Sequence, residues 1–112
     1  MGYKLSVQGT YTEITFDEPA DLNTLIQVNE HRNEHLRVLI DLSPGLAIDF
    51  SGLHDLLVEL NERCLPEGAT TAIYVQDNLD YGYSKVFEDY RTNLGLTVSV
   101  FRDKDEAIAW LE

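Results

Sequence analysis

The sequence is poor in cysteine, in basic residues and in long apolar runs. Cys64 is the only cysteine, which excludes an intrachain disulfide and fits a reducing compartment best. Only 8 Lys and Arg residues stand against 20 Asp and Glu, giving a formal net charge of −12. Nucleic acid and anionic membrane surfaces both require a basic footprint, so neither is expected as a partner. No apolar run reaches the ~18 residues of a membrane span, and we expect a cytoplasmic protein.

Motifs that would indicate a cofactor or a metal are also missing. The glycine patterns of P-loops and of dinucleotide-binding folds do not occur. A zinc site requires a cluster of Cys and His, which one Cys and three His (His31, His35 and His54) do not make. His31 and His35 are four residues apart and could share a helix face, but their polar surroundings favour a solvated surface. We therefore expect no cofactor and no metal.

What the sequence does have is regular hydrophobic patterning around residues 37–60. The apolar run at residues 38–42 is rich in β-branched side chains and is typical of a strand in the middle of a parallel sheet. A loop containing Ser43-Pro44-Gly45 follows. The next helix is predicted from residue 51 to about residue 65 by the spacing of Leu53, Leu56, Leu57 and Leu60. Cys64 continues this stripe, so we expect it to be buried.

Strands and helices alternate along the rest of the chain. Residues 3–8 and 11–16 predict a β-hairpin, and a short amphipathic helix follows residues 17–21. Residues 71–75 and 96–101 predict two further strands. The helix between them is expected to bury Tyr83, Val86, Phe87, Tyr90 and Leu94 and to end at Gly95. Asp103 caps a final helix that carries Ala107, Trp110 and Leu111.

This order, ββαβαβαβα, predicts an α/β fold in a single domain spanning residues 1–112. Strands that alternate with helices indicate a mostly parallel central sheet with helices packed on it. The N-terminal hairpin makes the first strand antiparallel. At 112 residues the chain has enough length for one core and no room for a second.

Ser51 is the residue at which we expect function, because it follows the central strand at the edge where open α/β sheets meet their ligands. One interpretation makes Ser51 the N-cap of the second helix, with Gly52 as the first helical residue. A second interpretation makes it a phosphoacceptor, whose phosphate would lie beside the unsatisfied N–H groups of the helix start. Both roles can hold at once.

A catalytic interpretation of the same region is weaker. Ser51, His54 and Asp49 could compose a nucleophilic triad on paper, but the sequence indicates neither an oxyanion hole nor a substrate cleft. Asp49 and Asp55 flank Ser51, and acids at this position complement the dipole of a helix start. We therefore expect a protein that is not an enzyme.

Two motifs in this region resemble the signature of STAS domains, the anti-sigma-factor antagonists and the related domains of sulfate transporters. The motifs are Ile40-Asp41-Leu42-Ser43 and Ile48-Asp49-Phe50-Ser51-Gly52-Leu53, and the closing segment Asp105-Glu106-Ala107-Ile108 matches as well. The resemblance implies a regulatory domain that binds a protein partner, either an anti-sigma kinase or another regulatory protein. It makes Ser51 the phosphoacceptor, with Asp41 and Ser43 supporting the loop. The interaction surface would include Asp49, Phe50, Gly52 and His54.

The second half of the chain also resembles small bacterial proteins that are likened both to STAS domains and to SEC14-type lipid-binding domains, through residues 101–111. This resemblance implies an alternative function, a domain that binds a small apolar ligand or a lipid. Tyr81 and Tyr83 would then join Phe50 in an apolar contact surface. The other interpretation of Tyr81 and Tyr83 is partial burial in the core. A second copy of the chain, giving a homodimer, stays open as a partner.

Overall fold

The computed structural model describes residues 3–32, 34–60 and 68–112, except for the side chains of Phe50, Glu59 and Leu60. The expected burial of Cys64 and the end of the second helix beyond residue 60 lie outside this described part. The elements are β1 (Tyr3–Val7), β2 (Thr12–Phe16), α1 (Leu22–Arg32), β3 (Arg37–Asp41), α2 (Phe50–Leu60), β4 (Thr70–Tyr74), α3 (Asn78–Asn93), β5 (Thr97–Phe101) and α4 (Lys104–Leu111). The predicted element order is confirmed.

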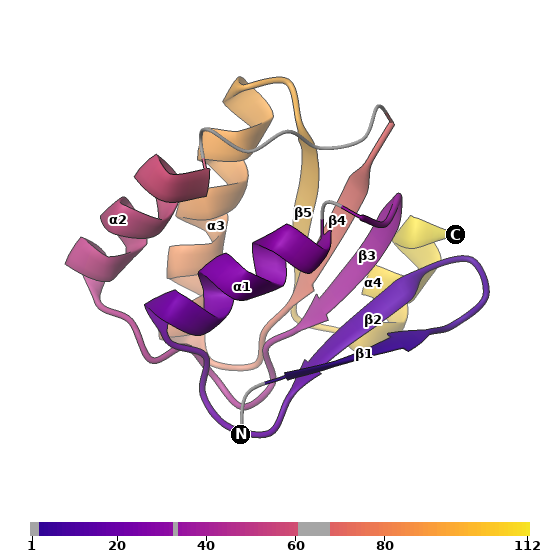
Figure 1. The fold of residues 1–112 in the computed structure, drawn as a ribbon, viewed down its shortest axis with the longest axis horizontal. Coiled ribbons are helices and arrows are strands. Elements are labelled where there is room, and N and C mark those ends of the chain that lie inside the picture. The colour runs from indigo at the N-terminus through magenta and orange to yellow at the C-terminus, as the bar shows by residue number, and fades with distance from the viewer. Residues whose placement is uncertain (1–2, 33, 61–67) are drawn as a thin grey trace.

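The five strands form one sheet in chain order, with β3 in the middle (Figure 1). β1 pairs with β2 in the antiparallel direction, and the pairs β2–β3, β3–β4 and β4–β5 are all parallel. The predicted α/β class, with a mostly parallel sheet and an antiparallel first strand, is therefore confirmed. Because β3 is central, the loop that follows it leaves from the middle of the sheet edge.

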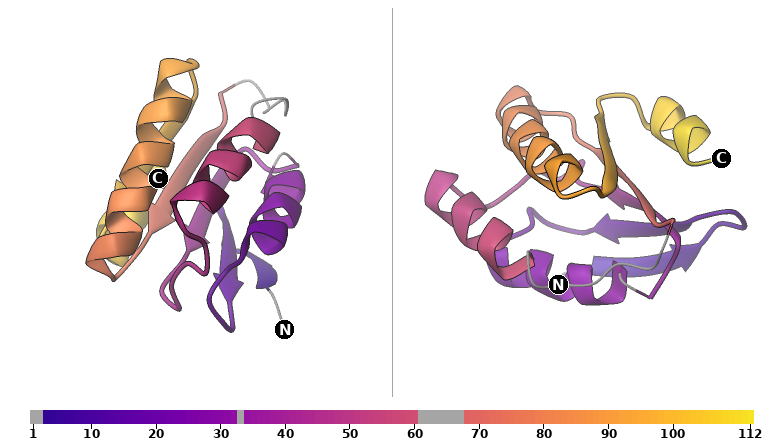
Figure 2. Two further views of the ribbon diagram at one scale, coloured as in Figure 1. Left: turned by 90° about the vertical axis from the view of Figure 1, so that its left-hand side faces the viewer. Right: turned by 90° about the horizontal axis from the view of Figure 1, so that it is seen from above.

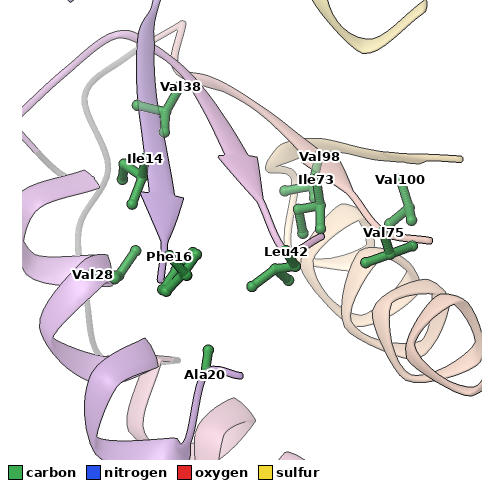
Figure 3. Close-up of a cluster of buried hydrophobic side chains, with 10 residues drawn as sticks. All are labelled: Ile14, Phe16, Ala20, Val28, Val38, Leu42, Ile73, Val75, Val98 and Val100. Atoms are coloured by element: carbon green, nitrogen blue, oxygen red, sulfur yellow. The ribbon is translucent and has the colours of Figure 1, made fainter. Parts of the chain in front are cut away.

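Helices cover both faces of the sheet, with α1, α2 and α3 on one face and α4 on the other (Figure 2). Side chains alternate along β3 accordingly, since Val38 packs in the core under α1–α3 and Leu39 packs against α4. Figure 3 shows the larger core, in which Val28 of α1 lies beside Ile14 and Phe16 of β2, and Val98 and Val100 of β5 lie near Ile73 and Val75. On α4, Ala107 and Leu111 are buried, whereas Trp110 is 39% exposed.

Helix α3 buries part of the face that its apolar residues predict, since Tyr83, Phe87 and Tyr90 are half-buried. Val86 is 43% exposed and Leu94, just past the helix, is 49% exposed. The most buried positions of α3 are polar: Asp80, Ser84, Glu88 and Arg91. One reason is that Glu88 Oε2 accepts a hydrogen bond from the Val100 N–H of the edge strand β5, at 2.8 Å. α3 thereby provides a hydrogen-bond acceptor for a backbone N–H of the edge strand, which has no neighbouring strand on that side.

The two histidines expected to share a helix face lie in different structures. His31 is in the last turn of α1 and is exposed, as predicted, with Nδ1 3.4 Å from Glu34 Oε1. His35 follows the end of α1 and is half-buried, with Nδ1 3.3 Å from Thr12 Oγ1 of β2. The expectation of a common solvated face was therefore wrong for His35.

All four helices begin with an aspartate whose carboxylate accepts backbone N–H groups. These residues are Asp21, Asp49, Asp77 and Asp103. Capping explains why acidic residues occur at the helix starts, because a capping carboxylate accepts backbone N–H groups that have no partner within the helix. Across the described ranges, no helix has the length and apolar character needed to cross a bilayer.

Candidate functional site

Ser51 lies in the first turn of α2, on the exposed surface at the edge of the sheet. The prediction that Ser51 caps the helix was wrong, because Asp49 takes that role. Asp49 Oδ1 accepts the Gly52 N–H at 2.8 Å, and the Asp49 carbonyl accepts the Leu53 N–H at 2.9 Å. The hydroxyl of Ser51 is therefore not required to start the helix.

Gly52 explains how the chain turns so tightly before α2. A Cβ at this position would lie 3.1 Å from Ile48 Cβ and 3.4 Å from Asp49 Oδ1. The first distance is shorter than ordinary van der Waals contact, so a side chain here would push Ile48 away. Glycine thus allows the capping carboxylate and the first turn to pack closely.

The loop between β3 and α2 is held from several sides. Its Gly45 carbonyl accepts the Ala20 N–H at 3.1 Å, and the Ala20 carbonyl accepts the Ala47 N–H at 2.7 Å. The loops that precede α1 and α2 are thus joined by a short parallel bridge. Gly45 has a φ of 106°, which favours glycine, and a Cβ there would lie 3.3 Å from Asp80 Oδ2. These contacts fix the loop that leads from β3 to Ser51 at the start of α2.

Asp41 supports this loop, but its side chain lies on the α4 side of the sheet. Oδ1 accepts the Ser43 N–H at 2.9 Å, and Oδ2 accepts a hydrogen bond from Lys104 Nζ at 2.8 Å. Lys104 also pairs with Glu13. Burial pushes the pKa of Asp41 up, but the hydrogen bonds from Lys104 and Ser43 outweigh it and lower the pKa below its usual value. Asp41 therefore belongs to a structural ion-pair cluster. No local pattern in the sequence indicates this cluster, because Lys104 lies 63 residues from Asp41.

The surface around Ser51 is exposed and acidic. Asp49, His54 and Asp55 are all exposed, and the side chain of Phe50 lies outside what the structure describes. Further exposed acids lie at the same edge of the sheet, where β2 and β4 end: Asp17, Glu18, Asp21 and Asp77. Parallel strands end at a common edge, so these loops bring their negative charges to one side of the molecule.

The geometry gives little support to a catalytic triad at this surface. Asp49 Oδ1 is engaged by the backbone of α2, and no hydrogen bond joins Ser51 to His54 among the contacts of the described residues. In those same residues, no group of three or more His, Cys, Asp or Glu side chains could hold a metal ion. The chemistry available at this surface is thus that of an exposed hydroxyl among carboxylates.

A second region lies beneath α2, where a cavity of about 70 Å³ remains between the three helices and the sheet. α2 packs mainly against α1 and α3, and Leu53 and Leu56 of α2 line the cavity. Tyr83 and Phe87 of α3 line it as well. Half-buried Tyr81 packs against the same core as Phe87 but is not among the residues that line the cavity, and the Arg102 guanidinium lies 5.5 Å from its ring centre.

One end of this cavity is polar and positively charged. Asn29 and Arg32 of α1 and Arg91 of α3 line it, and all three are buried. Arg32 Nε donates to Thr71 Oγ1 at 2.6 Å, and the Arg91 guanidinium carbon lies 5.6 Å from the centre of the Phe87 ring. Burial and the neighbouring charge of Arg91 lower the pKa of Arg32 to about 10. No pattern in the sequence indicates this site, because these polar residues are typical of the solvated ends of two helices.

Comparison of the chain with protein-family models, with curated proteins and with solved structures gives no match in any of the three.

Proposed function

We propose that this protein is a regulatory, non-enzymatic binding domain of the STAS type, and that phosphorylation of Ser51 switches its binding. The observation that carries this proposal is the exposure of Ser51 in the first turn of α2, directly after the loop of the central strand. Since Asp49 already caps the helix, modification of the Ser51 hydroxyl leaves the start of α2 intact.

The partner that this surface suits is a protein with a basic patch, such as an anti-sigma kinase or another regulatory protein. Exposed carboxylates surround Ser51, and the net charge of −12 favours encounter with a positively charged surface. The same charge opposes self-association through this edge, so a homodimer would use another surface.

Phosphorylation would end the binding through the cost of burying charge. A phosphate adds close to two negative charges at pH 7. Asp49 and Asp55 lie on either side of Ser51 in the sequence, and both are exposed beside it. A partner that covers an uncharged hydroxyl would then have to desolvate a dianion among carboxylates, which is unfavourable unless new cations meet it. The change acts on the docking surface and requires no rearrangement of the sheet.

The test combines phosphosite mapping with affinity capture from the native lysate. We expect wild type and Ser51→Ala to retain the same partner and Ser51→Glu to lose it. Ser6→Glu adds the same charge at an exposed serine of β1, and it should bind as wild type does. The switch is wrong if mass spectrometry never finds phosphate on Ser51, or if Ser51→Glu captures the partner as well as wild type.

The alternative function, binding of an apolar ligand or a lipid, is favoured by the cavity beneath α2. Its volume of about 70 Å³ is less than half of the ~150 Å³ that takes up benzene in an engineered cavity. A long acyl chain does not fit that space. This alternative is therefore restricted to a small ligand, which the polar residues at one end of the cavity would contact.

A further inference from the structure

The sheet has two outer strands, β1 and β5, and they differ in what borders their free sides. On β5, Glu88 of α3 accepts the Val100 N–H, so part of that side is closed. Within the described ranges β1 pairs with β2 alone, and Figure 1 shows no helix along its outer side. An outer strand with unpaired backbone groups is a template on which another strand can pair.

The free side of β1 carries the backbone groups of alternate residues. In the hairpin, the Gln8 N–H donates to the Tyr11 carbonyl at 2.8 Å. Pairs that exchange hydrogen bonds alternate with pairs that do not along an antiparallel ladder, so Ser6 and Lys4 bond to β2. The residues that turn their N–H and C=O groups to the free side are Tyr3, Leu5 and Val7. Among the described residues, no other hydrogen bond engages these groups.

The side chains of β1 also suit a contact between two copies of the chain. Tyr3 and Leu5 pack against the larger core, and Val7, on the same face, is 73% exposed. Lys4 and Ser6 lie on the other face and are exposed. No residue of β1 is acidic, in a chain with 20 Asp and Glu residues. Two such strands therefore meet without bringing carboxylates of β1 together.

We propose that two copies of this chain form a dimer through β1, in antiparallel pairing with Leu5 opposite Leu5 of the second copy. In this register Tyr3 lies opposite Val7, and Lys4 lies opposite Ser6. The outward backbone groups then meet as hydrogen-bonded pairs, which a shift by one residue would prevent. The contact is self-complementary about a two-fold axis, so it closes at two copies. Leu5 would join the two larger cores across the axis.

The neighbouring registers are less favourable. A shift by two residues in one direction places Lys4 opposite Lys4, and like charges directly opposite each other are destabilising. The same shift in the other direction leaves Tyr3 and Lys4 unpaired. The proposed register uses the whole of β1, and it puts Lys4 in one row with Glu13 of the second copy, which pairs with Ser6. Lys4 and Glu13 would then be two strands, or about 9.5 Å, apart, which offsets part of the repulsion between two acidic chains.

The dimer goes beyond the proposed function and leaves the surface of Ser51 free, because β2 separates β1 from β3. Two strands of five residues form a small contact, below the ~1,200 Å² at which stable complexes begin. We therefore expect a weak dimer, with a dissociation constant on the order of 0.1 mM.

Sedimentation equilibrium of the purified chain measures the assembly from ~10 µM to ~1 mM, a range that brackets the expected constant. Amide hydrogen exchange over the same range locates it. We expect a monomer at the lowest concentration and mainly a dimer at the highest. The N–H groups of Leu5 and Val7 should gain protection as the dimer forms, whereas those of Lys4 and Ser6, which already bond to β2, should change little.

Cysteine cross-linking tests the register in a Cys64→Ser background, which removes the natural cysteine. Leu5→Cys places two thiols directly opposite each other, with Cα atoms ~5.5 Å apart, within reach of a disulfide. Val7→Cys is the matched control, since Val7 is the more exposed residue but its two copies would lie ~14 Å apart. With oxidised glutathione, Leu5→Cys should cross-link about tenfold faster than Val7→Cys.

Val7→Pro removes an outward N–H and none that bonds to β2, so the monomer should fold and the dimer should weaken about tenfold. Val7→Ala keeps that N–H and should weaken the dimer less. The cross-linking pair tests the same contact if Val7→Pro fails to fold.

Several results would overturn the dimer. They are a chain that stays monomeric at ~1 mM, equal cross-linking of the two cysteine variants, and a dimer of unchanged strength in folded Val7→Pro. Protection of Leu5 and Val7 that appears only when another protein is added would assign β1 to that protein instead. These experiments use unmodified Ser51 and no partner, so their failure and failure of the Ser51 switch are distinguishable.

Discussion

Both faces of the sheet hold partly or fully buried cations, and two of these, Lys104 and Arg32, are held in different ways. On the α4 face, Lys104 Nζ bonds to the carboxylates of Glu13 and Asp41. On the face covered by α1, α2 and α3, the described partners of Arg32 are all neutral oxygens, and Arg32 lines a cavity. Two carboxylates offset the cost of burying the Lys104 charge, whereas neutral oxygens offset less of the cost of burying the Arg32 charge.

The α4 face therefore holds a cation paired with carboxylates, whereas the face under α1, α2 and α3 keeps polar groups that lack such partners among the described residues. The Lys104 cluster joins α4 to β2 and β3, and two carboxylates meet the charge of its cation. Arg32 joins the end of α1 to the start of β4, and beside it the Asn29 amide has an unused donor group. The face with incomplete pairing is also the face that α2, the helix of Ser51, covers (Figure 2).

The largest effect is expected from Arg32→Met, which removes the cation from the incomplete face. Four oxygens lose a hydrogen bond, among them Thr71 Oγ1 and the Thr70 carbonyl, although the Leu36 carbonyl keeps the Thr70 N–H as a donor. Buried acceptors left unsatisfied cost about 1–3 kcal/mol each, and relief of the unpaired charge offsets a part, so we expect a loss of about 3 kcal/mol. The free energy of unfolding in urea measures it. Arg37→Met, at an exposed arginine of β3, is the control and should change stability little.

A gain of stability in Arg32→Met would reverse the comparison. It would mean that the unpaired charge costs more than its four hydrogen bonds contribute, as is known for some buried ion pairs that are replaced by apolar residues.

Lys104→Met breaks the complete cluster and should cost about 2 kcal/mol at pH 7. Breaking a buried pair costs more, but the Lys104 side chain is 37% exposed, which weakens the pair. The folded-state pKa of Asp41 is lowered, so its contribution is present above the unfolded pKa and is lost as pH falls through the folded pKa. The difference between wild type and variant should therefore shrink below pH ~4. Urea unfolding at pH 7 and pH 3 measures this.

Lys4→Met, at an exposed position of β1, should leave stability unchanged at both pH values. A deficit in Lys104→Met that persists at pH 3 would mean that the methylene stem of Lys104, rather than its charge, holds α4 on the sheet.

The architecture could be predicted because its periodic patterns are local. Alternation marks β2, and the apolar run at residues 38–42 marks a strand with both faces covered, which β3 is. The apolar residues predict only part of the buried face of α3, because polar Glu88 and Arg91 are buried there as well. Glu88, for example, bonds to the backbone of β5. Hydrophobic periodicity carries no signal for such contacts.

The candidate site was predicted in part for the same reason. The exposure of Ser51 after a central strand followed from the element order, but the cap did not. Asp49 and Ser51 are both good caps two residues apart, and the sequence does not decide which of them accepts the first N–H groups of α2, as Asp49 does. The burial of Arg32 depends on oxygens of β4, 38 and 39 residues further along the chain, which no local pattern encodes.

The smallest effect is expected from Asp80→Asn, which concerns a second incompletely paired charge on the same face as Arg32. Burial, and then the charge of Asp77, raise the pKa of Asp80, although the Leu46 N–H bonds to it. A raised folded-state pKa gives stability that is present below the unfolded pKa and lost as pH rises. The amide keeps the size and the acceptor oxygen, so Asp80→Asn should gain about 0.5 kcal/mol at pH 7 and nothing at pH 3.

Asp89→Asn is the matched control at an exposed position of α3 and should show no such dependence on pH. If Asp80→Asn loses stability at pH 7 instead, its carboxylate contributes more as the acceptor of the Leu46 N–H than burial costs it. Among the described residues, the incompletely paired charge on the face under α1, α2 and α3 would then be that of Arg32.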